Sequence, residues 1–237
     1  MTPLVLLPGM MCDARLFAPQ IAAISDRAVM VAPLGGADSM AGLAAGVLAV
    51  APPRFALAGL SMGGIVAMEI VAQAPERVAG LCLMDTNPLA ERPEVAAARQ
   101  PQIAHVRDGG LGAVMRDEMK PNYLADGPRR PAILELCMEM ATALGPQVFA
   151  RQSRALMARP DRQDVLRGVR VPSLVLCGAE DSLCPPARHE LMRDLIPEAR
   201  LVVVDGAGHL PVLERPEAVN AALSAWLEEV EGCRITQ

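Results

Sequence analysis

The sequence is poor in aromatic side chains and has no basic runs. Only 2% of its 237 residues are Phe, Tyr or Trp, so flat surfaces for stacking bases or sugars are scarce. The formal net charge of −5 also argues against nucleic acid as a partner. The first apolar run, Leu4 to Leu7, follows no basic region and is far too short for a signal peptide or a membrane span. We therefore expect a soluble, cytoplasmic protein that binds neither nucleic acid nor membrane.

Signals for disulfides, metals and nucleotide phosphates are also lacking. The six cysteines are scattered along the chain without the spacing of a disulfide framework, so we expect free thiols. No Cys/His group has the spacing of zinc ligands, and no Gly-rich loop of the Walker type occurs. We expect neither a metal nor a cofactor.

The chain is rich in aliphatic residues and methionine. Hydrophobic residues make up 52% of the sequence and charged residues 21%, which is typical of a globular protein. With so few aromatic residues, leucine, valine, alanine and the 14 methionines must fill the core. The length allows one α/β domain with a large core, and a second independent core need not be assumed.

Short apolar runs alternate with segments long enough to hold helices. This alternation predicts an α/β fold with a mostly parallel sheet and right-handed crossovers. From Thr86 to about Arg170 the strand signals stop, and helical stretches broken by prolines such as Pro146 replace them. Near the C-terminus, 216–229 reads as a helix that packs Trp226 against the sheet. The predicted strands are Leu4–Leu7, Ala28–Ala32, Phe55–Ala58, Val78–Met84, Ser173–Cys177 and Leu201–Val204.

A serine bracketed by glycines stands between a strand-like and a helix-like run. Residues 59–64 read GLSMGG, with an apolar run on either side. A chain that passes from strand to helix so abruptly needs small residues around the turn, and it pushes the central side chain out above the sheet edge. A plain turn would also produce the pattern, but the flanking runs favour Ser61 as a nucleophile.

A serine nucleophile needs a base, and the chain has three histidines. His209 follows the predicted strand Leu201–Val204 directly, so it belongs to a loop at the carboxyl end of a strand. His189 lies in a probable helix among charged neighbours, where we expect a solvated surface histidine. His105 lies in the less regular middle of the chain. His209 is therefore the candidate base.

Two aspartates could orient that histidine. Asp181 and Asp85 each come just after a predicted strand, so both are expected at the sheet edge that carries Ser61. The residues alone leave the choice between them open.

Four motifs in order resemble the α/β-hydrolase superfamily, in its esterase and lactonase branch. They are LVLLPG at 4–9, GLSMGG at 59–64, GAED at 178–181 and GAGH at 206–209. The resemblance implies an α/β-hydrolase fold in which 1–85 and 171–237 form the core and 86–170 form an inserted helical cap. It assigns the triad acid to Asp181, with Asp85 at the position that some members use instead. Because the chain starts directly at the first motif, it resembles a minimal member.

An acyl transfer also needs donors for the oxygen that gains charge. One should be the backbone N–H of Met62, at the start of the helix after the nucleophile. Most relatives carry His-Gly in the loop after the first strand, whereas this chain has Pro-Gly at 8–9. By resemblance the second donor is the N–H of Met10, with Met11 as the alternative if the register slips by one.

The resemblance implies a serine esterase whose substrate is a small, largely apolar carboxylic ester, lactone or thioester. The same triad could serve cofactor-free perhydrolysis, carbon–carbon bond cleavage or a lyase reaction, or the protein could be a ligand receptor with little turnover.

We expect Lys120, the only lysine, to be exposed. Cap arginines could hold an acidic substrate group, although solvated positions are the plainer interpretation; they include Arg116, Arg129, Arg130 and Arg151. The sequence leaves open whether the chain forms a homo-oligomer.

Overall fold

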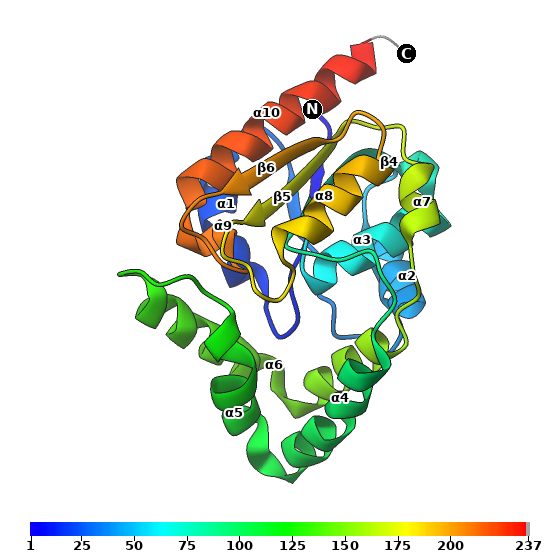
Figure 1. Cartoon of the computed structure of the whole chain (residues 1–237). Coiled ribbons are helices and arrows are strands. Elements are labelled where there is room, and N and C mark those ends of the chain that lie inside the picture. The colour runs from blue at the N-terminus through cyan, green and yellow to red at the C-terminus, as the bar shows by residue number, and fades with distance from the viewer. Residues whose placement is uncertain (236–237) are drawn as a thin grey trace.

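A six-stranded parallel sheet forms the centre of the computed structural model, which describes residues 1–235 (Figure 1). Its strand order is β2-β1-β3-β4-β5-β6, so the chain reverses its direction of travel across the sheet between β1 and β3. In parallel α/β sheets, such a switch point opens a crevice at the carboxyl ends of the strands. The strands are β1 (Leu4–Leu7), β2 (Val29–Val31), β3 (Phe55–Leu60), β4 (Val78–Met84), β5 (Ser173–Gly178) and β6 (Arg200–Val204). This arrangement confirms the predicted α/β-hydrolase type of fold.

Alternate side chains of the central strands enter two apolar clusters, one on each face of the sheet. Val5 and Leu7 belong to one cluster, whereas Leu4 and Leu6 belong to the other, as the two-residue period of a strand requires. Helices cover both faces, so all four side chains are fully buried. One face carries α2 (Met40–Val50), α3 (Met62–Gln73) and α8 (Pro186–Leu195), and the other carries α1 (Ala18–Ala23) and α10 (Pro216–Ile235).

The C-terminal helix packs its tryptophan against the sheet, as predicted. Trp226 on α10 is fully buried, and its indole N–H donates to the carbonyl oxygen of Pro172 at 3.0 Å. The helix extends beyond the predicted range, to Ile235. Figure 1 shows α10 running along the sheet beside β6.

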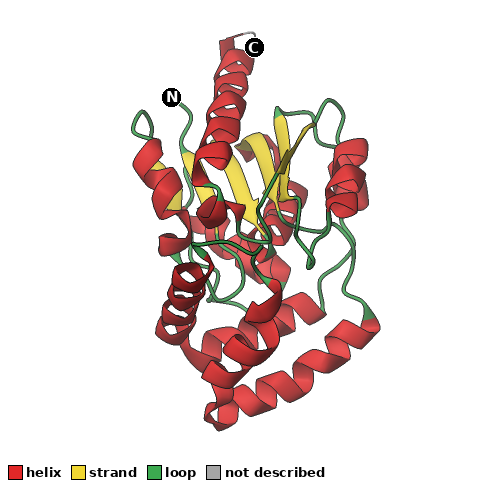
Figure 2. Cartoon of the chain, turned by 60° about the vertical axis from the view of Figure 1, so that its left-hand side comes forward, coloured by secondary structure: helices red, strands yellow, loops and turns green. Residues whose placement is uncertain are grey.

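The residues between β4 and β5, 86–170, contain helices and no strand; we call them the helical segment. Its α-helices are α4 (Pro93–His105), α5 (Leu111–Ala113), α6 (Arg130–Met157) and α7 (Gln163–Arg167). Short π-helical turns lie at Val106–Gly110 and Val114–Met119, and a 3₁₀ turn lies at Lys120–Asn122. Helices α4 to α6 lie beyond the carboxyl ends of the strands (Figures 1 and 2). The short α7 instead packs against α3 and α8.

Proline interrupts the longest helix where the sequence predicts a break. Within α6, Gly145 has φ 79° and ψ 176°, so two helices meet there at a kink just before Pro146. Glycine tolerates this conformation because it has no Cβ. Over residues 1–235, no helix combines the length and the apolar character needed to cross a membrane.

Candidate active site

Ser61 occupies the turn between β3 and α3 in a conformation that L-residues rarely adopt. Its φ of 54° and ψ of −117° turn the chain sharply from strand to helix. The glycines on either side make the turn possible. A Cβ on Gly59 would lie 2.3 Å from the carbonyl oxygen of Gly63, and a Cβ on Gly63 would lie 2.0 Å from that of Leu7. The turn therefore excludes larger residues at both positions.

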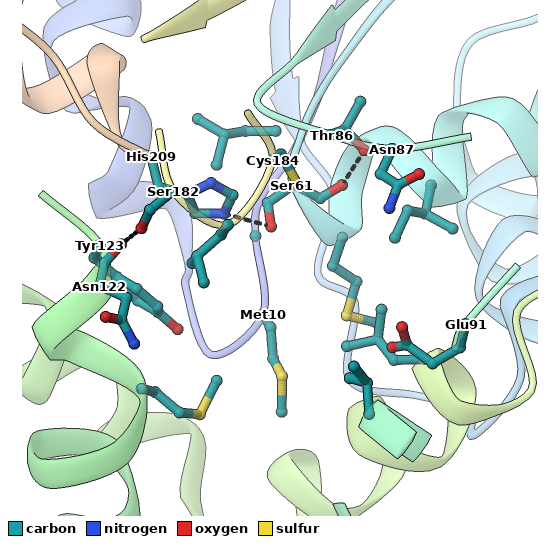
Figure 3. A pocket seen from close by; sticks show the side chains of 18 of the residues that line it. Met10, Ser61, Thr86, Asn87, Glu91, Asn122, Tyr123, Ser182, Cys184 and His209 are labelled. Atoms are coloured by element: carbon teal, nitrogen blue, oxygen red, sulfur yellow. Dashed lines mark hydrogen bonds between the residues drawn. The ribbon is translucent and has the colours of Figure 1, made fainter. Parts of the chain in front are cut away.

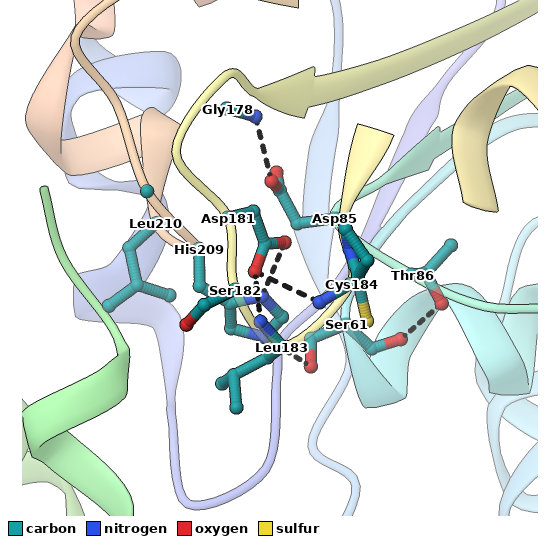
Figure 4. Close-up of polar contacts among 12 residues, drawn as sticks. Ser61, Asp85, Thr86, Gly178, Asp181, Ser182, Leu183, Cys184, His209 and Leu210 are labelled. Carbon is teal, nitrogen blue, oxygen red and sulfur yellow. Dashed lines mark hydrogen bonds and ion pairs between the residues drawn. The ribbon is translucent and has the colours of Figure 1, made fainter. Parts of the chain in front are cut away.

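Ser61, His209 and Asp181 form a hydrogen-bonded chain (Figure 4). Nε2 of His209 lies 2.8 Å from Oγ of Ser61, and Nδ1 lies 2.8 Å from Oδ2 of Asp181. A carboxylate can only accept, so Nδ1–H donates to Asp181 and the unprotonated Nε2 accepts the serine hydroxyl. The histidine and the aspartate are both buried. The structure thus brings together the three side chains that the sequence singles out.

The loop after β5 keeps Asp181 ionised. Its Oδ1 accepts the N–H groups of Leu183 at 2.9 Å and Cys184 at 3.0 Å. Burial raises the pKa of this carboxyl, but the hydrogen bond and charge of His209 and the two N–H donors outweigh burial. The pKa of Asp181 therefore lies below the ordinary value for aspartate.

Asp85, the alternative acid, lies next to Asp181 but does not contact the imidazole of His209. It is fully buried at φ 45°, and its Oδ1 accepts the N–H of Gly178 at 2.9 Å. Burial and the negative charge of Asp181 raise the pKa of Asp85 well above its ordinary value. Asp85 therefore holds its proton more strongly than the neighbouring Asp181.

Two backbone N–H groups beside Ser61 are free to bind an oxyanion. Among the described residues, neither Met62 at the start of α3 nor Met10 in the loop after β1 donates its N–H to a protein acceptor. The N–H of Met11 is different, because it donates to Oε1 of Gln152 at 2.9 Å. The geometry therefore leaves Met10 rather than Met11 available.

A buried glutamate that the sequence analysis missed holds the loop of His209. Glu214 accepts the N–H groups of Gly208 and Leu210 at 3.0 Å, and that of Ala125 in the helical segment at 2.9 Å. Burial raises the pKa of Glu214, although these N–H groups oppose the shift. A carboxylate on the turn directly after the histidine loop is the signal that could have identified it.

His189 is buried, contrary to the prediction of a surface histidine. It lies on α8, where Met192 shares its buried face, so the charged neighbours point the other way. Its Nε2 accepts the N–H of Thr86 at 3.0 Å, and Oγ1 of Thr86 donates to the carbonyl oxygen of Ser61 at 2.7 Å. Burial lowers the pKa of His189 to about 4, so its ring is neutral at physiological pH. His189 thus supports the serine turn through Thr86.

The prediction for Lys120 is also wrong. Its side chain is buried, and Nζ donates to the carbonyl oxygen of Leu134 on α6. Burial lowers the pKa of Lys120, and the aliphatic stem packs inside the helical segment. His105, by contrast, is exposed at the end of α4 and does not line the cavity.

A cavity of about 570 Å³ opens over Ser61 and His209, between the sheet edge and the helical segment. Met10 lies in the middle of the view in Figure 3, with Asn122 and Glu91 on opposite sides of it. The lining mixes apolar and charged residues. The apolar residues include Leu60, Met62, Ile65, Val95, Met119, Leu156, Leu183 and Leu210; the charged ones are Glu91, Arg92, Arg99, Glu118, Arg159 and Arg188.

The residues around the histidine make a poor metal site. Ligand atoms of Asp181, Cys184 and His209 lie within 4.8 Å of one another. However, the carboxylate and the imidazole already bond to each other, and burial raises the pKa of the Cys184 thiol well above its ordinary value. A protonated thiol is a weak metal ligand. This trio is therefore better explained by the hydrogen-bonded chain to Ser61.

Known proteins share both the sequence pattern and the fold. The model of the alpha/beta hydrolase family matches residues 4–222. A pimeloyl-[acyl-carrier protein] methyl ester esterase of Aromatoleum aromaticum is 32% identical over 185 residues, which cover 70% of this chain and 71% of the relative. A malate-bound thermophilic esterase of Thermogutta terrifontis superposes with a TM-score of 0.88 at 31% identity, covering 97% of this chain and 90% of the other.

A second solved structure is also similar to this chain in fold and sequence. The enol-lactonase of Burkholderia xenovorans superposes with a TM-score of 0.84 at 25% identity, covering 96% of this chain and 92% of the other. The family match, together with the esterase relatives, makes the chain a carboxylic-ester hydrolase. The chain belongs to the alpha/beta hydrolase family.

Proposed function

We propose that Ser61, His209 and Asp181 are the catalytic triad of this hydrolase. The observation that carries the proposal is the pair of 2.8 Å contacts that link the three side chains directly below an open cavity. Oγ of Ser61 attacks the substrate carbonyl while Nε2 of His209 takes its proton. The ionised Asp181 stabilises the imidazolium and holds the tautomer in which Nε2 is the base.

The oxygen of the tetrahedral intermediate binds to the N–H groups of Met62 and Met10. Both are close to Ser61 in the fold and neither is used by another acceptor within the described chain. His209 then returns its proton to the leaving alcohol or thiol, which leaves an acyl group on Ser61. Water, activated by the same imidazole, attacks this acyl-enzyme, and the breakdown of the second intermediate releases the acid and restores the serine.

The helical segment acts as a cap that selects the substrate. Helices α4 and α6 supply much of the cavity wall that faces the triad, through residues such as Val95, Ala98 and Leu156. The volume suits a small carboxylic ester, lactone or thioester, and many of the lining residues are apolar. The names of the esterase and enol-lactonase relatives support an ester or a lactone as the substrate.

The experiment is the hydrolysis of p-nitrophenyl acetate, butyrate, hexanoate and octanoate by the wild type, Ser61→Ala and Ser182→Ala. Ser182 lines the same cavity, and its Oγ donates to the carbonyl oxygen of Asn122 at 3.3 Å rather than to the imidazole, so it is a matched control. We expect Ser61→Ala to lower kcat/KM by about a thousand-fold or more. Equal rates in the wild type and Ser61→Ala would overturn the proposal.

A further inference from the structure

An ion-pair cluster forms part of the cavity wall on the side of the helical segment. Glu91 precedes α4, Arg99 lies within α4, and Arg159 follows α6. Oε2 of Glu91 lies 3.3 Å from Nη2 of Arg99, and Oε1 lies 3.1 Å from Nη2 of Arg159. The side chains are 5%, 16% and 11% exposed, and all three line the cavity.

One carboxylate cannot accept hydrogen bonds from all the N–H groups of two buried guanidinium groups. Each guanidinium presents a fork of N–H donors, and Glu91 takes up only one nitrogen of each. Both Nε atoms are buried without a hydrogen-bond partner, and the nearest partner of the Arg99 Nη1 is the weak acceptor Sδ of Met10 at 3.8 Å. Glu91 therefore leaves part of the donor capacity of both guanidinium groups unused.

The net charge around the cluster also favours the binding of an anion. Glu91, Arg99 and Arg159 together carry one excess positive charge, and Arg188 adds a further positive charge to the same cavity wall. Burial lowers the pKa of Arg159, the charge of Glu91 opposes this shift, and repulsion from Arg99 and Arg188 adds to it. A bound anion would relieve this repulsion and could accept from the Nη1 groups that Glu91 leaves unused.

We propose that Arg99 and Arg159 form a subsite for a carboxylate group of the substrate. The substrate would then be an ester, lactone or thioester with an apolar middle and one anionic end. A guanidinium fork matches the two oxygens of a carboxylate, which makes arginine suited to this recognition. The inference rests on the proposed function, because it places the carboxylate in the cavity above Ser61.

The position of Arg99 relates the subsite to the reacting carbonyl. Met10 supplies the proposed oxyanion N–H from its backbone, and its Sδ contacts Arg99. The carboxylate and the carbonyl oxygen would therefore lie near opposite ends of the same methionine. An ion pair that only joined α4 to the end of α6 would not distinguish between charged and neutral substrates, so the two roles can be separated by experiment.

The experiment compares two matched pairs of esters. One pair is 4-nitrophenyl hydrogen glutarate and its methyl ester, with the carboxylate on the acyl side. The other is 4-carboxyphenyl butyrate and its methyl ester, with the carboxylate on the alcohol side. The readout is the ratio of kcat/KM for the anionic ester to kcat/KM for the neutral one, so that leaving-group differences cancel between variants.

We expect Arg159→Gln and Arg99→Gln to lower this ratio about ten-fold or more for at least one pair. Glu91→Gln, which removes the competing negative charge, should raise the ratio. Arg116→Gln is the control, because Arg116 lies on the exposed face of the helical segment, pairs with Asp117 and does not line the cavity. Its ratio should equal that of the wild type.

Unchanged ratios in both arginine variants would overturn the subsite while leaving the esterase function intact. If an arginine variant fails to fold, the opposite shift in Glu91→Gln decides the question. If the wild type hydrolyses none of the four esters, the proposed function fails instead. Calorimetric titration of glutarate into the wild type and Arg159→Gln then tests the subsite directly, with weaker binding by the variant as the expected result and equal binding as the contrary one.

Discussion

Gln152 on α6 accepts the main-chain N–H of Met11 at 2.9 Å, across 141 positions of sequence. Its Nε2 also donates to the carbonyl oxygen of Leu34 at 2.8 Å, so one buried amide ties the loop after β1 to the loop after β2. Met11 has φ 56°, a strained conformation that this hydrogen bond helps to hold. Gln152 therefore fixes the loop that presents the N–H of Met10.

Replacing Gln152 by leucine should lower both stability and kcat. The change leaves two buried main-chain groups without partners, each worth about 1–3 kcal/mol, and it frees the loop of Met10. We expect kcat to fall about ten-fold or more on p-nitrophenyl butyrate. The matched control is Gln73→Leu, since Gln73 is exposed at the end of α3. Equal kcat values in the two variants would argue against a role for this loop in binding the oxyanion.

Glu214→Ala should misplace His209. Without the carboxylate, the N–H groups of Gly208, Leu210 and Ala125 have no acceptor, and the loop that carries the imidazole loses one of its links to the helical segment. We expect kcat/KM to fall about a hundred-fold, with substantial recovery in Glu214→Gln, which keeps one acceptor oxygen. Glu217→Ala, at an exposed glutamate, serves as the control. The account fails if Glu214→Ala and Glu217→Ala have the same activity.

The two neighbouring aspartates should respond differently to amide substitution. Asp181→Asn removes the charge that stabilises the imidazolium, so we expect a loss of about a thousand-fold or more in kcat. Asp85→Asn replaces a carboxyl whose pKa is raised by burial with an amide of the same shape that can still accept the N–H of Gly178. We expect Asp85→Asn to stay within about ten-fold of the wild type. The reverse order of activities would identify Asp85 as the acid.

His189 should make stability depend on pH. Because burial lowers its pKa from 6.5 to about 4, the unfolded chain binds a proton between these values while the folded chain does not. The contribution of His189 to the free energy of unfolding is therefore fully present above pH 6.5. It falls by on the order of 3 kcal/mol as the pH is lowered toward 4.

The measurement is urea unfolding of the wild type and His189→Gln across this pH range. Glutamine can still accept the N–H of Thr86, but it does not titrate. The difference between the two unfolding free energies should change with pH, because contributions shared by both proteins cancel. A difference that is constant with pH would show that His189 does not titrate below its ordinary range.

The sequence predicted the strands well because a parallel strand buried on both faces is a continuous apolar run. The ranges Leu4–Leu7 and Val78–Met84 are the same in prediction and structure, and the other strands differ by at most two residues at an end. Strand β3 continues two residues beyond the predicted Ala58, up to the serine turn. The break at Pro146 could also be predicted from the sequence, because the ring of proline itself interrupts a helix.

Side chains in amphipathic helices were harder to place from their neighbours. His189 stands beside charged residues, yet it points into the protein, because a helix changes the face it presents every few residues. Lys120 is also buried, but it begins a three-residue turn in which no helical period indicates the direction of a side chain. The arginines of the cavity were not predicted for a related reason. Arg159 meets Glu91 from 68 positions away, which no local pattern reveals. The arginines that the sequence analysis named instead do not line the cavity: Arg116, Arg129, Arg130 and Arg151.

The most direct test of the account is covalent labelling with diethyl p-nitrophenyl phosphate, followed by mass spectrometry of the peptides. An activated serine displaces p-nitrophenol and keeps the phosphoryl group, whereas an ordinary serine does not react. We predict one adduct per chain, on Ser61, and its loss in His209→Ala. The absence of any adduct on the wild-type protein would contradict the assignment of Ser61 as the nucleophile. So would an adduct on Ser182 or Cys184 instead of Ser61.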